Sequence, residues 1–336
     1  MSVSDTSNSD KLTKLKINKF HPERSFQSPA WCLNGHLHTI VSSFFNRDGL
    51  PEHDHLVIAT PDDDFLELDF VDAGEETPIA ILLHGLEGSS NRYYMSQLAE
   101  TLKEGGISSL SLNFRSCGSH LNRQLRFYHS GETSDVSFVA NWLRIHFPNR
   151  LLFGVGFSLG GNVLVKWLGE EKENIPISAA VAVSAPYDLE TCSVNIEQGF
   201  NKVYELRFLQ TLIKKANEKR KHYPEIPEFH GKTLREFDDQ ITSVIHGFKG
   251  VDDYYQKASS APYVKDIRVP TLLVHSREDP ICPIDAVPLK DAHHNPYIQT
   301  VITEKGGHVG FWSQPPGWLE NTILHFFQWF INNRKS

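Results

Sequence analysis

Residues 150–171 read RLLFGVGFSLGGNVLVKWLGEE, an apolar run that passes through a Gly-x-Ser-x-Gly turn into a second, mostly apolar stretch. The first run is short and apolar throughout, which is typical of a strand buried on both faces of a sheet. Glycines on both sides of Ser158 let neighbouring backbone approach closely, so a sharp turn can hold the serine between strand and helix. A glycine-rich turn without catalysis is the plainer interpretation. The flanking strand and helix favour Ser158 as a nucleophile.

Short apolar runs alternate with longer amphipathic runs on both sides of this segment. Further strand-like runs cover residues 78–85, 107–114, 177–186, 269–276 and 297–303. Apolar side chains recur at helical spacing in residues 91–106, 134–147 and 317–333. This alternation is typical of parallel strands joined by crossover helices. Two alternating runs, at 53–60 and 64–72, are joined by a PDDD turn and predict an antiparallel hairpin. The predicted fold class is α/β, with a mixed, mostly parallel central sheet flanked by helices.

The β/α rhythm stops between residues 187 and 260, which are charged, helix-prone and without a strand-like run. We interpret them as a helical cap insertion in a single domain that spans residues 21–336. Residues 1–20 lack the apolar core of a secretion signal. We therefore expect a mobile tail there and no stable membrane anchor.

A serine nucleophile needs a histidine base and a carboxylate that orients the histidine. In this arrangement the chain order is serine, acid, histidine, with acid and base each on a loop after a late strand. Asp279 follows the run at 269–276, and His308 follows the run at 297–303. Asp188, after the preceding strand, is an alternative acid, and the neighbouring Glu278 is a weaker one.

Acyl transfer also requires backbone N–H donors aimed at the oxygen on which negative charge develops. The residue after the nucleophile supplies one donor in this architecture, and the loop after an early strand supplies the other. Those positions predict the N–H groups of Leu159 and Leu86 as the oxyanion hole. Leu86 lies in the sequence His84-Gly85-Leu86-Glu87-Gly88, which a simple glycine turn would also explain.

Composition excludes several other classes of function. The chain has 336 residues, 33 Lys and Arg against 41 Asp and Glu, and a net charge of −8, so nucleic acid is not an expected partner. Four cysteines without a CxxC pair favour a reducing, cytoplasmic location. The histidine pairs at 36/38, 53/55 and 293/294 fit no closed metal site, and no dinucleotide fingerprint follows the first strand. We expect neither a metal nor another cofactor.

Several motifs together resemble the YheT-like branch of the α/β-hydrolases, also called the AB hydrolase 4 family. The resemblance covers the chain from about residue 27 onward. It rests on WCLNGHLHTI at 31–40, which is similar to the family's NGHLQT element with His38 in place of glutamine, and on HGLEGSS, NFR, YHSGET, FSLGGN and GGHVGF. The family usually reads Asn-Phe-Arg-Gly-Cys, and Ser116 stands where that glycine is expected. Family serine, aspartate and histidine match Ser158, Asp279 and His308.

The resemblance implies an α/β-hydrolase domain with esterase or lipase activity on carboxylic esters of short to medium acyl chains. An alcohol acyltransferase with the same triad is an alternative, and a binding module without catalysis is a further one. We expect a small ester with an apolar acyl chain as substrate. Aromatic residues of the cap, Phe200, Tyr204, Phe208, Phe237 and Phe248, suit such a chain, but packing of the cap on the core explains them equally well. The sequence does not determine the oligomeric state.

Overall fold

The structure is a computed structural model that describes residues 19–44 and 50–334. Within them, strands form one sheet in the order β1-β2-β4-β3-β5-β6-β7-β8. The strands are β1 (Asp54–Thr60), β2 (Asp64–Val71), β3 (Ile79–Leu83), β4 (Ser108–Asn113), β5 (Leu152–Phe157), β6 (Ala179–Val183), β7 (Thr271–Ser276) and β8 (Ile298–Thr303). β2 runs antiparallel to both β1 and β4, and the pairs from β4 through β8 are parallel. The predicted mixed, mostly parallel sheet and its leading hairpin are confirmed.

Helices cover both faces of the sheet, and alternate residues of each strand point to opposite faces. In β3, Ile79, Ile81 and Leu83 pack on one side while Ala80 and Leu82 pack on the other. The first face is covered by α4 (Ser134–His146), α5 (Leu159–Glu171) and α11 (Leu289–His294). The second is covered by α3 (Tyr93–Glu104) and α12 (Trp318–Arg334). The three predicted helices are present.

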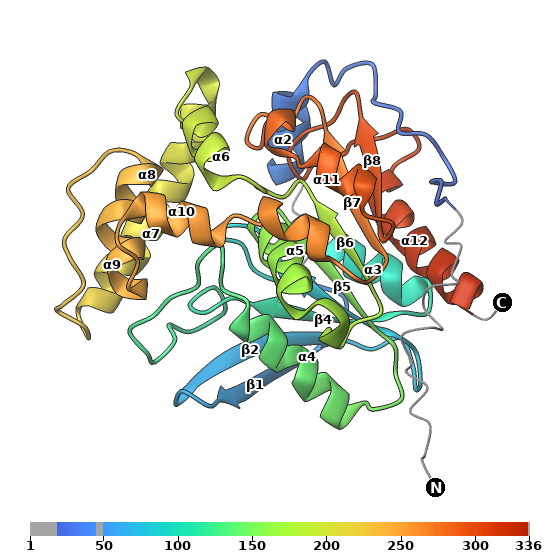
Figure 1. Cartoon of the computed structure of the whole chain (residues 1–336), viewed down its shortest axis with the longest axis horizontal. Helices are drawn as coiled ribbons and strands as arrows, with labels where there is room; N and C mark the ends of the chain where they lie inside the picture. The colour runs from blue at the N-terminus through green and yellow to red at the C-terminus, as the bar shows by residue number, and fades with distance from the viewer. Residues whose placement is uncertain (1–18, 45–49, 335–336) are drawn as a thin grey trace, which may run out of the picture.

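Between β6 and β7 the chain forms five α-helices and no strand, and Figure 1 shows most of them gathered at one end of the molecule, far from α12. They are α6 (Leu189–Ile196), α7 (Lys202–Arg220), α8 (Leu234–Phe237), α9 (Ser243–His246) and α10 (Val251–Ala258). A π-helical turn, Asp238–Thr242, joins α8 to α9. We call residues 187–260 the cap segment. Its assignment as an insertion stays a prediction.

The amino-terminal part of the described chain packs on the domain. Phe20 is buried and lies edge-on to Phe326 of α12, with ring centroids 5.2 Å apart, so it differs from the mobile tail expected for residues 1–20. Residues 1–18 of that tail lie outside the described residues. Residues Gly35–Phe44 form helix α2, which the sequence pattern did not predict. No helix within residues 19–44 and 50–334 has both the length and the apolar character to cross a bilayer.

Candidate active site

Ser158 occupies a sharp turn at the carboxyl end of β5. Its backbone has φ 53° and ψ −122°, a strained conformation for a residue with a side chain, and α5 begins at the next residue, Leu159. The turn is possible because its neighbours are glycines. A Cβ on Gly156 would lie 2.3 Å from the carbonyl oxygen of Gly160, and a Cβ on Gly160 would lie 2.4 Å from that of Leu83. The strain presents the Ser158 hydroxyl above the sheet edge.

The structure brings Ser158, His308 and Asp279 together in one hydrogen-bonded chain. The Ser158 hydroxyl lies 2.6 Å from Nε2 of His308, and Nδ1 of His308 lies 2.9 and 3.1 Å from the two carboxylate oxygens of Asp279. Oδ1 of Asp279 also accepts backbone hydrogen bonds from Ile281 and Cys282, both at 2.9 Å. Each group can therefore hold its neighbour in the orientation that proton transfer from Ser158 requires.

Electrostatics keep Asp279 ionised. Burial alone raises the pKa of its carboxyl, but electrostatic attraction to the adjacent His308 ring and the His308 hydrogen bond outweigh burial and hold the pKa below the usual value. Burial also lowers the pKa of His275, at the end of β7. His275 is thus neutral and donates from Nε2 to the carbonyl oxygen of Cys282 at 2.9 Å. This bond ties β7 to the loop that carries Asp279.

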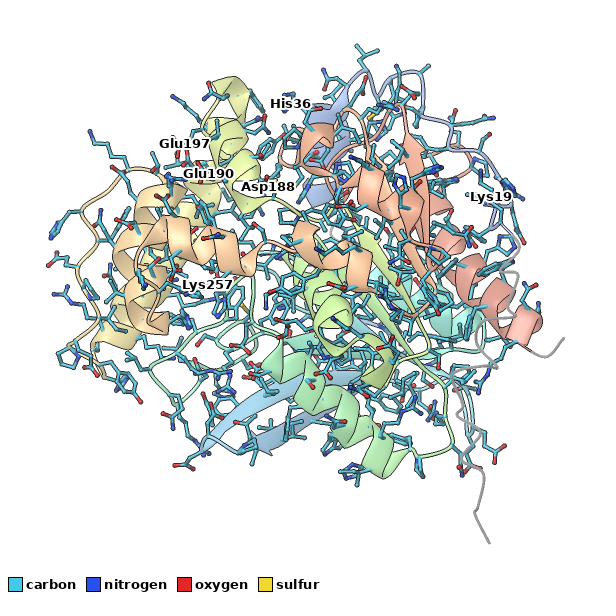
Figure 2. All side chains as sticks on the ribbon, in the orientation of Figure 1. Lys19, His36, Asp188, Glu190, Glu197 and Lys257 are labelled. Atoms are coloured by element: carbon cyan, nitrogen blue, oxygen red, sulfur yellow. The ribbon has the colours of Figure 1, made fainter. Side chains whose placement is uncertain are left out.

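Neither alternative acid reaches His308 in the described structure. Asp188 caps α6, because its Oδ1 accepts a hydrogen bond from the Thr191 N–H at 3.0 Å. Figure 2 shows Asp188 at the start of α6, among the helices of the cap segment. Glu278 has a buried carboxylate oxygen, but no hydrogen bond or ion pair joins its side chain to His308 among the described residues. The geometry favours Asp279 as the partner of His308.

The loop after β3 has its backbone groups tied to buried side chains. The Gly85 N–H donates to the Tyr94 hydroxyl at 3.0 Å, and the Glu87 N–H donates to the Tyr128 hydroxyl at 2.8 Å. Gly88 N–H donates to the Gly85 carbonyl at 3.0 Å. In the described structure the Leu86 N–H, between these groups, has no protein acceptor. It stays available for a ligand oxygen.

His84 fixes the direction of that free N–H. Its Nε2 accepts the Phe114 N–H at 3.1 Å, so the proton lies on Nδ1, which donates to the Gly85 carbonyl at 2.7 Å. Burial lowers the pKa of His84 to about 3, so this tautomer is uncharged at neutral pH. The Gly85 carbonyl and the Leu86 N–H belong to one trans peptide and point in opposite directions. By fixing the Gly85 carbonyl, His84 therefore also fixes the direction of the Leu86 N–H.

Leu159 offers the second predicted donor. It is the first residue of α5, so its N–H has no acceptor within the helix and lies at the positive end of the helix dipole. Leu86 and Leu159 both line the same pocket as Ser158. Gly85 brings the loop close, since a Cβ there would lie only 3.1 Å from the Ser158 Cβ. The two predicted donors flank Ser158, and their role stays a prediction.

Helix α2 holds the loop that carries His308, which sequence reasoning missed. The Thr39 hydroxyl accepts the backbone N–H of His308 at 2.9 Å and donates to the Gly35 carbonyl at 2.8 Å. A Cβ on Gly35 would lie 1.8 Å from the Glu278 carbonyl oxygen, so glycine is required for α2 to reach the Asp279 loop. The NGHLHT element therefore joins the acid loop to the histidine loop. The resemblance marked these residues without indicating that role.

Two positions that differ from the family pattern are accommodated locally. Ser116 keeps a left-handed backbone with φ 64°, and its hydroxyl bonds to Asn122 Oδ1 at 2.6 Å and accepts the Asn122 N–H at 3.2 Å. His38 is fully buried on α2, and its Nε2 lies 3.0 Å from the Ser28 hydroxyl. Burial lowers the pKa of His38 to about 4, so it is neutral near pH 7. Neither Ser116 nor His38 lines the pockets at Ser158.

Two pockets meet at Ser158, with Leu86, Phe208 and Ile281 as shared lining. The first pocket, here the apolar pocket, extends under the cap segment. Its lining includes Leu189, Ile196, Phe208, Leu212, Tyr254 and Ile281. The second pocket, here the basic pocket, lies on the side of His308. Its lining includes Thr39, Arg92, Tyr204, Arg207, Thr211 and His308.

The sequence left open whether the aromatic residues of the cap contact the substrate or pack the cap on the core. The structure places some of them at the pockets and others in apolar clusters. Phe208 lines both pockets, and Tyr204 lines the basic one. Phe237 and Phe248 pack instead within apolar clusters of the cap segment. Phe200 is 52% exposed and contacts the His36 ring edge-on, with centroids 5.0 Å apart. Figure 2 shows His36 on α2, facing the cap helices. Only part of this aromatic set is positioned to contact a substrate.

Potential metal ligands gather at one place among the described residues. One ligand atom each from Asp279, Cys282 and His308 lie within 4.8 Å of one another. The Asp279 and His308 atoms are already engaged with each other and with Ser158. The histidine pairs at 36/38, 53/55 and 293/294 join no such cluster within the described chain. All four cysteines are free thiols.

The chain is similar to several known proteins. The chain matches the family described as alpha/beta hydrolase fold over residues 78–315. YheT of Escherichia coli strain K12 has been provisionally named an esterase. It is 36% identical to this chain over 327 residues, which cover 93% of this chain and 95% of YheT. Phospholipase ABHD3 of Homo sapiens is 27% identical over 326 residues, covering 92% of this chain and 80% of that protein.

A yeast enzyme and a solved structure extend the comparison. Monoacylglycerol lipase of Saccharomyces cerevisiae is 30% identical over 285 residues, covering 81% of this chain and 62% of the lipase. Esterase Pf2001 of Pyrococcus furiosus superposes with a TM-score of 0.58 at 20% identity, covering 90% of this chain and 98% of that one, which shows a common fold. The chain therefore belongs to the α/β-hydrolase family, in its YheT-like branch of esterase- and lipase-type enzymes.

Proposed function

We propose that this protein is a serine hydrolase that cleaves carboxylic esters of short to medium acyl chains. The hydrogen-bonded chain from Ser158 through His308 to Asp279 is the observation that carries the proposal, because it supplies an activated nucleophile beside an apolar pocket. The names of the relatives, an esterase, a phospholipase and a monoacylglycerol lipase, support the same class of reaction. No cofactor is needed for this chemistry.

The mechanism follows from the positions of the atoms. Ser158 Oγ attacks the ester carbonyl carbon while His308 Nε2 takes the hydroxyl proton, and Asp279 stabilises the imidazolium that forms. The Leu86 and Leu159 N–H groups stabilise the tetrahedral oxyanion. His308 then protonates the alcohol oxygen as the ester C–O bond breaks, leaving an acyl group on Ser158. Water, deprotonated by His308, attacks the acyl-enzyme and releases the acid.

The two pockets have different positions relative to His308. The departing alcohol must lie near His308, which donates a proton to it, so we assign the alcohol part to the basic pocket. The acyl chain then extends into the apolar pocket, which His308 does not line. Burial of each methylene there contributes roughly 0.8 kcal/mol to binding. Leu189, Leu212 and Tyr254 are among the side chains that would contact the acyl chain.

Ser158→Ala tests the proposal. We expect the variant to lose fluorophosphonate labelling and hydrolysis of p-nitrophenyl esters together, by up to about a million-fold in turnover as for another serine hydrolase. Ser109→Ala is a matched control, because Ser109 is buried in β4 with an unpartnered hydroxyl and lines neither pocket. A Ser158→Ala protein that still hydrolyses esters would refute the assignment. A folded wild-type protein that neither labels nor hydrolyses any ester would favour a binding module.

Acyl transfer to an alcohol uses the same residues and stays an alternative prediction. It differs only in whether water or an alcohol attacks the acyl-enzyme. Added ethanol distinguishes the two, because transfer diverts product from the free acid to the ethyl ester. A cytoplasmic location likewise stays a prediction, supported by the four free thiols.

A further inference from the structure

The basic pocket carries an uneven distribution of charge. Arg92, at the start of α3, and Arg207, on α7, both line it and are both exposed. Glu87 is the one carboxylate among its described lining residues. That carboxylate is already neutralised, since Lys215 Nζ lies 2.6 Å from its Oε1. The pocket therefore presents two positive charges without a matching negative one.

Both guanidinium groups retain donors for a ligand. Arg207 has no hydrogen bond or ion pair from its side chain within the described residues. Arg92 uses one Nη2 hydrogen bond, to the Glu87 carbonyl at 2.8 Å, and its other N–H groups have no acceptor in that same part of the chain. A guanidinium offers five N–H donors in a planar fork that matches carboxylate and phosphate oxygens. Both arginines thus have N–H donors that can bind an anion in the basic pocket.

The position of these arginines links the anion to one part of the substrate. His308 lines the same pocket, and it protonates the departing alcohol in the mechanism proposed above. Arg92 and Arg207 are absent from the lining of the apolar pocket. A negative charge that they bind therefore belongs to the alcohol part of the ester, not to the acyl chain.

We propose that the natural substrate is an ester whose alcohol part carries an anionic group, a phosphate or a carboxylate, and that Arg92 and Arg207 select it. The apolar pocket takes the acyl chain and the basic pocket takes the charged alcohol. This inference rests on the proposed hydrolase activity and specifies its substrate class. Overall charge works in the opposite sense, because the chain carries a net charge of −8 that disfavours anions elsewhere on the surface.

Matched pairs of esters test the proposal. One pair is octanoylglycerol phosphate against octanoylglycerol, and the other is p-octanoyloxybenzoate against p-octanoyloxybenzamide. Members of a pair share the acyl chain and differ in the charge of the alcohol part. We expect the wild-type protein to have a higher kcat/KM for the charged member of at least one pair. The pair with the larger ratio identifies phosphate or carboxylate as the preferred anion.

Arginine variants connect the preference to the pocket. Arg207→Gln and Arg92→Gln should each lower the ratio of charged to neutral kcat/KM by about threefold to fivefold, mostly through KM, as expected for exposed charge pairs. The ratio should also fall as salt rises, because ions screen exposed charges. Lys214→Gln is the matched control, because it removes one positive charge from an exposed position of α7 outside both pockets. It should leave the ratio unchanged.

The outcomes separate this inference from the activity on which it rests. Hydrolysis of both members of each pair at equal rates, or a preference that both arginine variants retain in full, would overturn the anionic substrate and leave the hydrolase intact. Hydrolysis of none of the four esters by the folded wild-type protein would contradict the hydrolase itself, and the substrate class with it.

Discussion

The hydroxyl of Thr39 lies 269 residues away from His308 along the chain, yet it accepts that residue's backbone N–H at 2.9 Å. Thr39→Val removes this acceptor at nearly constant volume. We expect kcat/KM for a p-nitrophenyl ester to fall about fivefold, since one net hydrogen bond contributes about 1 kcal/mol. Thr39→Ser keeps the acceptor and should retain activity. Equal activity of the valine variant and the wild type would show that α2 does not position His308.

The three residues of the hydrogen-bonded chain could be predicted from sequence, and the residues that hold them in place could not. Ser158, Asp279 and His308 each follow a recognisable strand, and the order of the three types along the chain is informative on its own. The contact of Thr39 with His308 depends on where α2 docks, and no local pattern encodes that docking. His84 is similar, because its role depends on which peptide its Nδ1 reaches.

At the scale of elements, helix α7 is connected directly to the loop after β3. Lys215 Nζ lies 2.6 Å from Glu87 Oε1, which also accepts the Tyr128 hydroxyl at 2.8 Å. Glu87 has a left-handed backbone with φ 52°, and it directly follows Leu86, the proposed oxyanion donor. The cap segment therefore holds the conformation of the loop that aims the Leu86 N–H.

Lys215→Met tests this connection. It leaves the Glu87 carboxylate, only 7% exposed, without its counter-charge, so we expect a loss of about 1–3 kcal/mol in the free energy of unfolding. We also expect kcat to fall more than KM rises, because the oxyanion donors act mainly in the transition state. Urea denaturation and ester kinetics measure the two effects. Lys215→Arg should restore most of both. An unchanged kcat in the Lys215→Met variant would show that α7 does not hold the loop after β3 in its active conformation.

Strands were predictable as elements because five strands of the sheet are buried on both faces, and three of them, β3, β5 and β6, appear as continuous apolar runs. Helix α2 escaped prediction because GHLHTIVSSF starts with glycine and contains β-branched residues, which are weak helix formers. Its stability comes from docking on the loops after β7 and β8. Tertiary contacts of this kind determine whether a short helix forms, and the periodicity of the sequence does not reveal these contacts.

At the scale of the whole molecule, buried histidines make stability depend on pH. The pKa is lowered by burial to about 4 or about 3 in four cases: His38, His84, His129 and His246. An unfolded chain takes up protons on these residues as pH falls below about 6.5, while the folded chain does not until its lower pKa is reached. Stability conferred by the neutral form is therefore complete above about pH 6.5 and is lost as pH falls.

His38→Gln measures one share of this effect. Glutamine is the residue expected there from the family pattern, and it can still bond to the Ser28 hydroxyl. We expect the loss of unfolding free energy between pH 7 and pH 4.5 to shrink by about 2 kcal/mol, from a folded pKa of about 4, in urea denaturation at each pH. His21→Gln replaces an exposed histidine and is the control for the substitution itself. If the His38→Gln variant lost as much unfolding free energy between pH 7 and pH 4.5 as the wild type, His38 would not contribute to the pH dependence.

The cap segment leaves and re-enters the core at adjacent points. The Ala261 N–H donates to the Tyr187 carbonyl at 2.9 Å, and the Leu189 N–H donates to the Ser259 hydroxyl at 3.0 Å, so hydrogen bonds close the two ends of the segment on each other. A recombination event could replace this segment with the corresponding segment of a related protein. The two new junctions would then lie next to each other, where the segment already leaves and re-enters the core. Such an exchange would change part of the lining of the apolar pocket and leave Ser158, Asp279 and His308 in place.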